Sequence, residues 1–141
     1  SRTPPEAARA WSYFIYGRVD TKGIFKAGTH IIKVPKDKLD LIKSNGMLEK
    51  DIVLGIRPED IHDEEVVMKT YPDAILNIKV DVAELLGSET NIYTVVNESN
   101  ICAVVNARTN ISIGAEIKLA LDMNKAHFFN PETELVLKQK D

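Results

Sequence analysis

The sequence holds few of the residues and motifs on which enzymes and membrane-spanning proteins depend. Its 141 residues include one cysteine, so an internal disulfide cannot form. The three histidines lie far apart in different local patterns and support no metal site. Neither a glycine-rich phosphate loop nor a dinucleotide-binding fingerprint is present. No apolar run approaches the ~20 residues of a membrane-spanning helix, and no basic-then-apolar start indicates a signal peptide.

The charge balance and the low aromatic content argue against a nucleic-acid-binding protein. Lysine and arginine number 18 against 21 aspartates and glutamates, a net charge of −3, and aromatic residues make up 6% of the chain. A single-strand-binding groove needs basic residues interleaved with stacking aromatic side chains. With 44% hydrophobic and 28% charged residues, the composition is typical of one ordinary globular domain.

The single thiol, Cys102, lies within the apolar run 101–105. Free cysteine is among the most buried residue types, whereas a nucleophilic thiol needs a neighbouring base and a polar, partly exposed site. We therefore expect Cys102 to be a small buried hydrophobe, and its isolation fits a reducing compartment.

From Phe14 onward the sequence has the pattern of short strands separated by turns. The clearest strand is 76–83, where apolar and more polar residues alternate. One helix is expected over 36–44, ended by Asn45 and Gly46, and a four-residue hairpin loop over 97–100. Strands are expected at 14–19, 24–27, 30–34, 51–57, 76–83, 90–96, 101–105, 116–122 and 135–137. The pattern predicts a mainly β fold, a small barrel or sandwich with about eight or nine short strands and one short helix.

Two polar stretches each have a functional and a structural interpretation. The segment 59–65 carries five acidic residues around His62 but lacks the spacing and central glycine of a calcium loop. A solvated loop or short helical turn is favoured there. The loop 106–110, with Asn106, Arg108 and Asn110, offers donors for a small oxyanion. Because the same residue types dominate ordinary turns, a plain polar loop is favoured.

Three segments, in order along the chain, resemble one family. Residues 54–61 read Leu-Gly-Ile-Arg-Pro-Glu-Asp-Ile and are similar to the Gly-Ile-Arg-Pro-Glu signature of the C-terminal regulatory domain in sugar-importer ATPases of the maltose-transporter type. Residues 82–89 are similar to a strand end of that domain, and 114–133, with its His-Phe-Phe-Asn-Pro-Glu-Thr end, resembles the closing strand. Asn130 and Glu134 stand where the family commonly has aspartate and glycine.

The resemblance implies an oligonucleotide-binding-like (OB-like) β-barrel of the transport-associated (TOBE) variety, over residues 14–141. Residues 1–13 fit nothing in the pattern and are interpreted as a linker or an appended segment. In the family this domain follows the nucleotide-binding domain, which has no counterpart in the chain, so ATP and Mg²⁺ would bind outside it. No catalytic, cofactor-binding or metal-binding residue is expected within the chain.

The resemblance also implies partners and a location. The partners are a second copy of the subunit, the ATPase domain of its own chain and the membrane subunits of a transporter, with no nucleic acid. The location is cytoplasmic, peripheral to the inner face of the cell membrane. Regulatory or interface contacts are expected at Arg57, Glu59, Leu86, Gly87, Ser88, Glu89, Asn106, Arg108 and Asn110.

Some alternatives stay open. Arg57 and Glu59 fit a contact with a neighbouring domain and a local ion pair about equally. Related barrels in molybdate systems bind the oxyanion at subunit contacts, which keeps an oxyanion-binding module as the second interpretation. A barrel that binds single-stranded nucleic acid is the third. The sequence does not identify the imported sugar.

One prediction concerns chemistry. Because no phosphate-binding loop is present, the 141-residue chain is expected neither to bind nor to hydrolyse ATP. Titration calorimetry with Mg-ATP and a phosphate-release assay measure both properties. Saturable binding at micromolar ATP would contradict the prediction.

Overall fold

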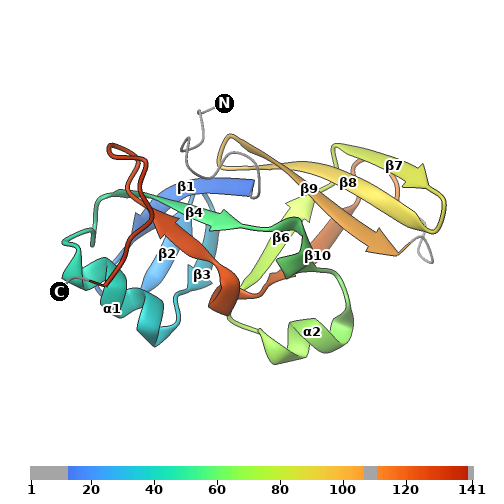
Figure 1. Ribbon diagram of the computed structural model, residues 1–141. Helices are drawn as coiled ribbons and strands as arrows, with labels where there is room; N and C mark the ends of the chain where they lie inside the picture. Colours follow the sequence, from blue (N-terminus) through green and yellow to red (C-terminus); the bar gives the residue numbers. More distant parts are fainter. Residues whose placement is uncertain (1–12, 107–110, 140–141) are drawn as a thin grey trace.

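The computed structural model describes residues 13–106 and 111–139, and within these ranges the chain forms eleven strands and two α-helices (Figure 1). The strands are β1 Tyr13–Val19, β2 Ile24–Ala27, β3 His30–Lys33, β4 Asp51–Ile56, β5 Ile61–His62, β6 Ile75–Lys79, β7 Val82–Leu86, β8 Glu89–Val96, β9 Ser99–Asn106, β10 Glu116–Leu121 and β11 His127–Phe129. The helices are α1 Lys36–Ser44 and α2 Glu65–Thr70, with short 3₁₀ turns η2 Pro58–Asp60 and η3 Met123–Lys125. The mainly β class is confirmed.

The strands pair into three antiparallel sheets. Five strands form the first in the order β11-β4-β1-β2-β3, three form the second in the order β5-β10-β6, and three form the third in the order β7-β8-β9. Figure 1 shows the third sheet extending away from the first, with the second lying between them. The backbone hydrogen bonds between the described strands are therefore divided among three separate sheets.

One hydrophobic core joins the three sheets. Fully buried side chains reach it from the first sheet (Ile15, Leu54), from the second (Leu119) and from the third (Ile92). Helix α1 closes one end of it through Ile42, which is also fully buried. Because every sheet contributes to one core, the three sheets fold as a single unit.

The adjacent aromatics Phe128 and Phe129 point to opposite faces of the first sheet, as the alternation of a strand requires. Phe128 packs edge-on against Phe25 in the main core, with ring centroids 5.9 Å apart. Phe129 packs edge-on against Phe14, also at 5.9 Å, in a small second cluster on the other face. Val136 packs against this second cluster, so the C-terminal segment covers the face of the first sheet that points away from the main core.

The third sheet is held to the first by its β8–β9 turn. This turn has two residues, Asn97 and Glu98, both with positive φ, as tight hairpins of this kind require. The Asn97 side-chain amide donates to the carbonyl of Tyr16 at 2.7 Å, a contact between residues 81 positions apart. The polar turn residue therefore ties two sheets together.

Several local expectations are corrected by the structure. The expected 76–83 strand is two strands, because the chain turns at Val80 and Asp81 and begins a different sheet. The expected four-residue loop over 97–100 has two residues, since Val96 and Ser99 already pair. Residues 135–137 form one isolated bridge, Phe129 to Val136, instead of a strand.

Two further differences concern helices and the thiol. A second helix, α2, follows the acidic segment and begins at its last residue, Glu65. Cys102 is half-buried, because the side chains of β9 alternate and Cys102 points outward while Ile101 and Ala103 point into the core. The helix expected over 36–44 is confirmed at the same bounds.

The close approach of Gly55 to two aromatic rings generates a prediction about stability. A Cβ at Gly55 would lie 2.7 Å from the Phe129 ring and 3.3 Å from the Phe14 ring. Gly55→Ala is therefore expected to lower the free energy of unfolding by ~1–3 kcal/mol through overpacking. Urea denaturation measures the change.

The matched control for Gly55→Ala is a double variant. Phe129→Leu removes the ring that the new methyl group would meet. The double variant should therefore lose less stability than the sum of the two single variants. Additive losses would show that the methyl group and the ring do not collide.

Candidate interaction surface

The third sheet presents one face to the core and the other away from it. We call the outward set the outer face; it consists of Val82, Glu84, Leu86, Glu89, Asn91, Tyr93, Val95, Asn100, Cys102, Val104 and Asn106. The register places these side chains in cross-strand rows, for example Val82–Tyr93–Cys102 in the middle of the sheet. The outer face is thus a continuous surface of three strands.

This outer face is unusually apolar for an exposed surface. Val82, Leu86, Tyr93, Val95 and Val104 are each between 38% and 53% exposed. A sheet with one solvated face normally alternates apolar residues with polar ones. Here the strands carry large apolar side chains on both faces, so burial in the core does not account for the outer set.

The first described residue of the chain borders this surface. Strand β1 contacts β9, and Tyr13 lies close to Cys102 and Tyr93. Partial burial raises the pKa of Tyr13, with smaller contributions from Cys102 and Tyr93. The start of β1 therefore lies beside the middle row of the outer face.

The structure brings together three of the residues expected at subunit contacts. Leu86 pairs with Glu89 across the β7–β8 hairpin, and Glu89 pairs with Asn106 across β8 and β9. The three side chains form one cross-strand row at the end of the outer face. Gly87 and Ser88 form the exposed hairpin turn, where Gly87 has a positive φ. Arg108 and Asn110 lie outside the described residues.

Arg57 and Glu59 lie elsewhere. Both are exposed and flank Pro58, where β4 ends and η2 begins. No ion pair joins them within the described part of the chain, and Arg57 instead acts on His127. Burial lowers the pKa of His127, and the nearby charges of Lys38 and Arg57 lower it further. We call Arg57 and Glu59 the charged corner. They follow β4 of the first sheet, whereas the outer face belongs to the third sheet.

The acidic segment 59–65 is split between different environments. Asp60 is buried, 3.9 Å from the Lys125 ammonium group, and its carbonyl accepts from the Asp122 amide at 3.0 Å. His62 Nδ1 lies 3.5 Å from Glu64 Oε2. Across residues 13–106 and 111–139, no group of three or more potential metal ligands lies together. In the same ranges no helix has both the length and the apolar character needed to cross a membrane.

Sequence reasoning missed eight of the eleven residues of the outer face, among them the apolar Val82, Tyr93, Val95 and Val104. In 92–96 the polar Thr94 interrupts the apolar residues, but 101–105 is apolar at every position, so a signal for Val104 was present. A run of that kind is also typical of a strand buried on both faces, so the sequence did not distinguish burial from exposure.

Comparisons with known proteins agree with this architecture. Residues 14–61 match the MalK OB fold domain, and residues 54–129 match the TOBE domain. The oligosaccharides import ATP-binding protein MsmX of Bacillus subtilis is 42% identical over 122 residues, 86% of this chain and 33% of that protein. The multiple sugar-binding transport ATP-binding protein MsmK of Streptococcus mutans is 39% identical over 107 residues, 76% of this chain and 28% of that protein.

A solved structure supports the fold alone. The cytoplasmic molybdate-binding protein ModG superposes with a TM-score of 0.59 at 10% identity, covering 82% of this chain and 93% of that one. At that identity the likeness concerns the arrangement of strands and carries no ligand with it.

The chain belongs to the TOBE domain family. Its N-terminal part matches the MalK OB fold domain, and the relatives MsmX and MsmK are named as ATP-binding proteins of oligosaccharide import and of multiple sugar-binding transport. The chain spans about a third of the length of these relatives, and their ATPase domain is not within it.

The environment of His127 generates a pH prediction. Removing one neighbouring positive charge stabilises the protonated imidazole, so Arg57→Gln is expected to raise the pKa of His127. A pH titration followed by NMR of the imidazole ring measures this. Arg18→Gln, at an exposed arginine paired with Asp51, serves as the matched control and should leave His127 unchanged.

The same shift has a consequence for stability. The folded-state pKa of His127 lies below its ordinary value of 6.5, so the unfolded chain binds the proton more readily. The neutral His127 imidazole therefore contributes to the free energy of unfolding above pH 6.5, and this contribution is lost as the pH falls toward the folded-state pKa. A smaller loss is expected in Arg57→Gln; an equal or larger one would contradict the electrostatic role of Arg57.

Proposed function

We propose that the complete subunit binds and hydrolyses ATP to drive carbohydrate uptake, and that this domain holds two copies of the subunit together. In this proposal the outer face of the third sheet contacts the same face of a second copy. The observation that carries it is the set of exposed apolar side chains on that face. Contiguous apolar patches are rare on monomer surfaces and mark sites of interaction.

The charge pattern of the outer face suits contact with a second copy. Its charged residues, Glu84 and Glu89, lie on the side of the middle row that is nearer the β7–β8 turn. A two-fold axis running along the middle row would face these glutamates with the neutral end at Val95 and Asn100 of the other copy. The pairing keeps like charges apart and brings the apolar rows together.

The same pattern disfavours anionic partners. Strands β7, β8 and β9 contain two glutamates and neither lysine nor arginine. Binding to a nucleic acid depends on neutralising phosphates with basic side chains. The outer face offers none, so a protein surface is a better partner for it.

The other partners follow from the subunit as a whole. The ATPase domain of the same chain would contact the charged corner at Arg57 and Glu59, which are exposed and carry opposite charges. ATP, Mg²⁺ and the membrane subunits would bind to that domain, placing the protein in the cytoplasm at the inner face of the membrane. The present chain would then contribute assembly and regulation, with no chemistry of its own.

Self-association of the 141-residue chain tests the proposal. One small domain offers a contact near the lower limit for a stable interface, ~1,200 Å² in total. We therefore expect a weak dimer, with a dissociation constant in the micromolar range or above, measured by sedimentation equilibrium. Val104→Glu places a charge in the middle of the contact and should weaken the dimer about tenfold or more.

The matched control is Ile31→Glu, which places the same charge on an exposed isoleucine of β3 in the first sheet. It should leave the dimer unchanged. Equal weakening by both variants would show that the outer face is not the contact. A chain that stays monomeric at the highest accessible concentration would assign dimerisation to the ATPase domain.

A further inference from the structure

A hollow of about 360 Å³ lies where the first and second sheets meet. Three segments distant in sequence line it: the end of β3 with the start of α1, the α2–β6 connection, and η3. One side is closed by the Lys33 amide, which donates to the Asp73 carbonyl at 2.9 Å. Its size falls within the range of about 300–1,000 Å³ that is usual for small-ligand sites.

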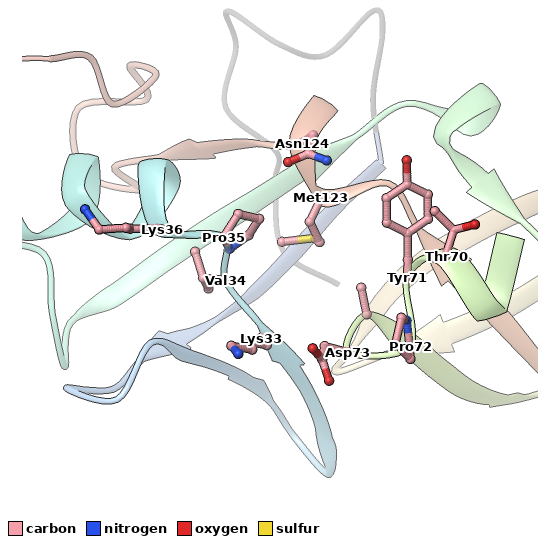
Figure 2. A pocket seen from close by; sticks show the side chains of 11 residues that line it. Lys33, Val34, Pro35, Lys36, Thr70, Tyr71, Pro72, Asp73, Met123 and Asn124 are labelled. Carbon is pink, nitrogen blue, oxygen red and sulfur yellow. The ribbon is translucent and has the colours of Figure 1, made fainter.

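The walls of the hollow are apolar. Figure 2 shows Pro35 and Tyr71 on opposite sides, with Met123 between them. Val34, Ala74 and Met123 are buried, so these surfaces belong to the core and their positions are fixed. A ligand between Pro35 and Tyr71 would pack against one aliphatic ring and one aromatic ring.

The polar groups of the hollow are few and of mixed charge. Asn124 lies at the top and Lys33 and Asp73 at the bottom of the view in Figure 2. Lys36 points away from the hollow and is paired with Asp40 at 3.2 Å. The Lys33 ammonium group and the Asp73 carboxylate carry opposite charges, so together they add no net charge to the hollow. The hollow therefore selects for neither an anion nor a cation.

We propose that this hollow binds a neutral saccharide of one or two rings. A sugar ring has apolar C–H faces that pack on an aromatic ring, and its hydroxyl groups both donate and accept hydrogen bonds. Tyr71 supplies the ring, Asp73 accepts, Lys33 donates, and the Asn124 amide does both. A polyhydroxylated, uncharged ligand uses all four groups, whereas an anion would be repelled by Asp73 and a cation by Lys33.

The proposal is independent of the self-association proposal. The hollow is lined by the end of β3, the start of α1, residues 70–74 before β6, and η3, and none of its residues belongs to the outer face. By binding a saccharide in this hollow, the domain would act as a sensor of sugar. Saccharide binding to the hollow does not depend on the dimer contact, so one proposal can fail while the other holds.

NMR titration of the ¹⁵N-labelled chain with D-glucose and with maltose tests the hollow directly. We expect saturable shifts, with millimolar affinity, confined to the amides of the non-proline residues in 33–36, 70–74 and 123–124. Tyr71→Ala should weaken the binding about tenfold. Leu135→Ala, which shortens an exposed side chain outside both the hollow and the outer face, is the control and should have no effect.

A second variant covers the case in which Tyr71→Ala does not fold, because Tyr71 also packs against the core. Asn124 is exposed, and its backbone amide rather than its side chain bonds to Asp122, so Asn124→Ala preserves the local structure. It should weaken binding severalfold. No saturable shift with either sugar, or shifts located elsewhere, would overturn the proposal. Tighter binding of glucose 6-phosphate than of glucose would overturn the choice of a neutral ligand.

Discussion

The pairing of β11 with β4 is the constraint on which the rest of the fold depends. It joins two segments about seventy residues apart, with Gly55 opposite His127 and Val53 opposite Phe129. The pairing places Phe128 in the main core and Phe129 in the second cluster, where its ring occupies the space that a side chain at Gly55 would need. Glycine at this position is therefore a packing requirement, since its backbone conformation is one that any residue can adopt. Everything between the two strands, including the second and third sheets, is closed into one loop by this contact.

Much of the fold could be predicted because local signals were strong. The helix over 36–44 has an apolar stripe, a proline before it and Asn45-Gly46 after it, and these signals determine its bounds. The strand breaks were harder. The alternation over 76–83 continues through Val80 and Asp81, yet the chain changes sheets there, because the Val80 amide bonds to Ala115 and the Asp81 amide to Tyr93. Those partners lie in other segments, so no local pattern could indicate the break.

The candidate surface shows the same limit. Leu86 and Glu89 were expected at contacts as part of one strand-end segment and Asn106 as part of a separate loop, and only the register of three strands brings them into one row. Val104 lies in a run of consecutive apolar residues, and Tyr93 lies between Ile92 and Thr94. Their exposure depends on which elements pack against the third sheet, and the local sequence does not indicate that. The hollow at Tyr71 was beyond sequence reasoning altogether, because its three lining segments meet only in the folded chain.

The attachment of the third sheet has a mechanical consequence. Its β8–β9 turn is fastened to the first sheet by Asn97, whereas its β7–β8 turn lies at the opposite end, at the far right of Figure 1, with Leu85 and Leu86 exposed. The inner face of the same sheet also packs into the main core along its length, through residues such as Ile92, Val96 and Val105. Core packing along β8 and β9 would therefore pass a force applied at Leu86 on to the first and second sheets, in addition to the hydrogen bond of Asn97.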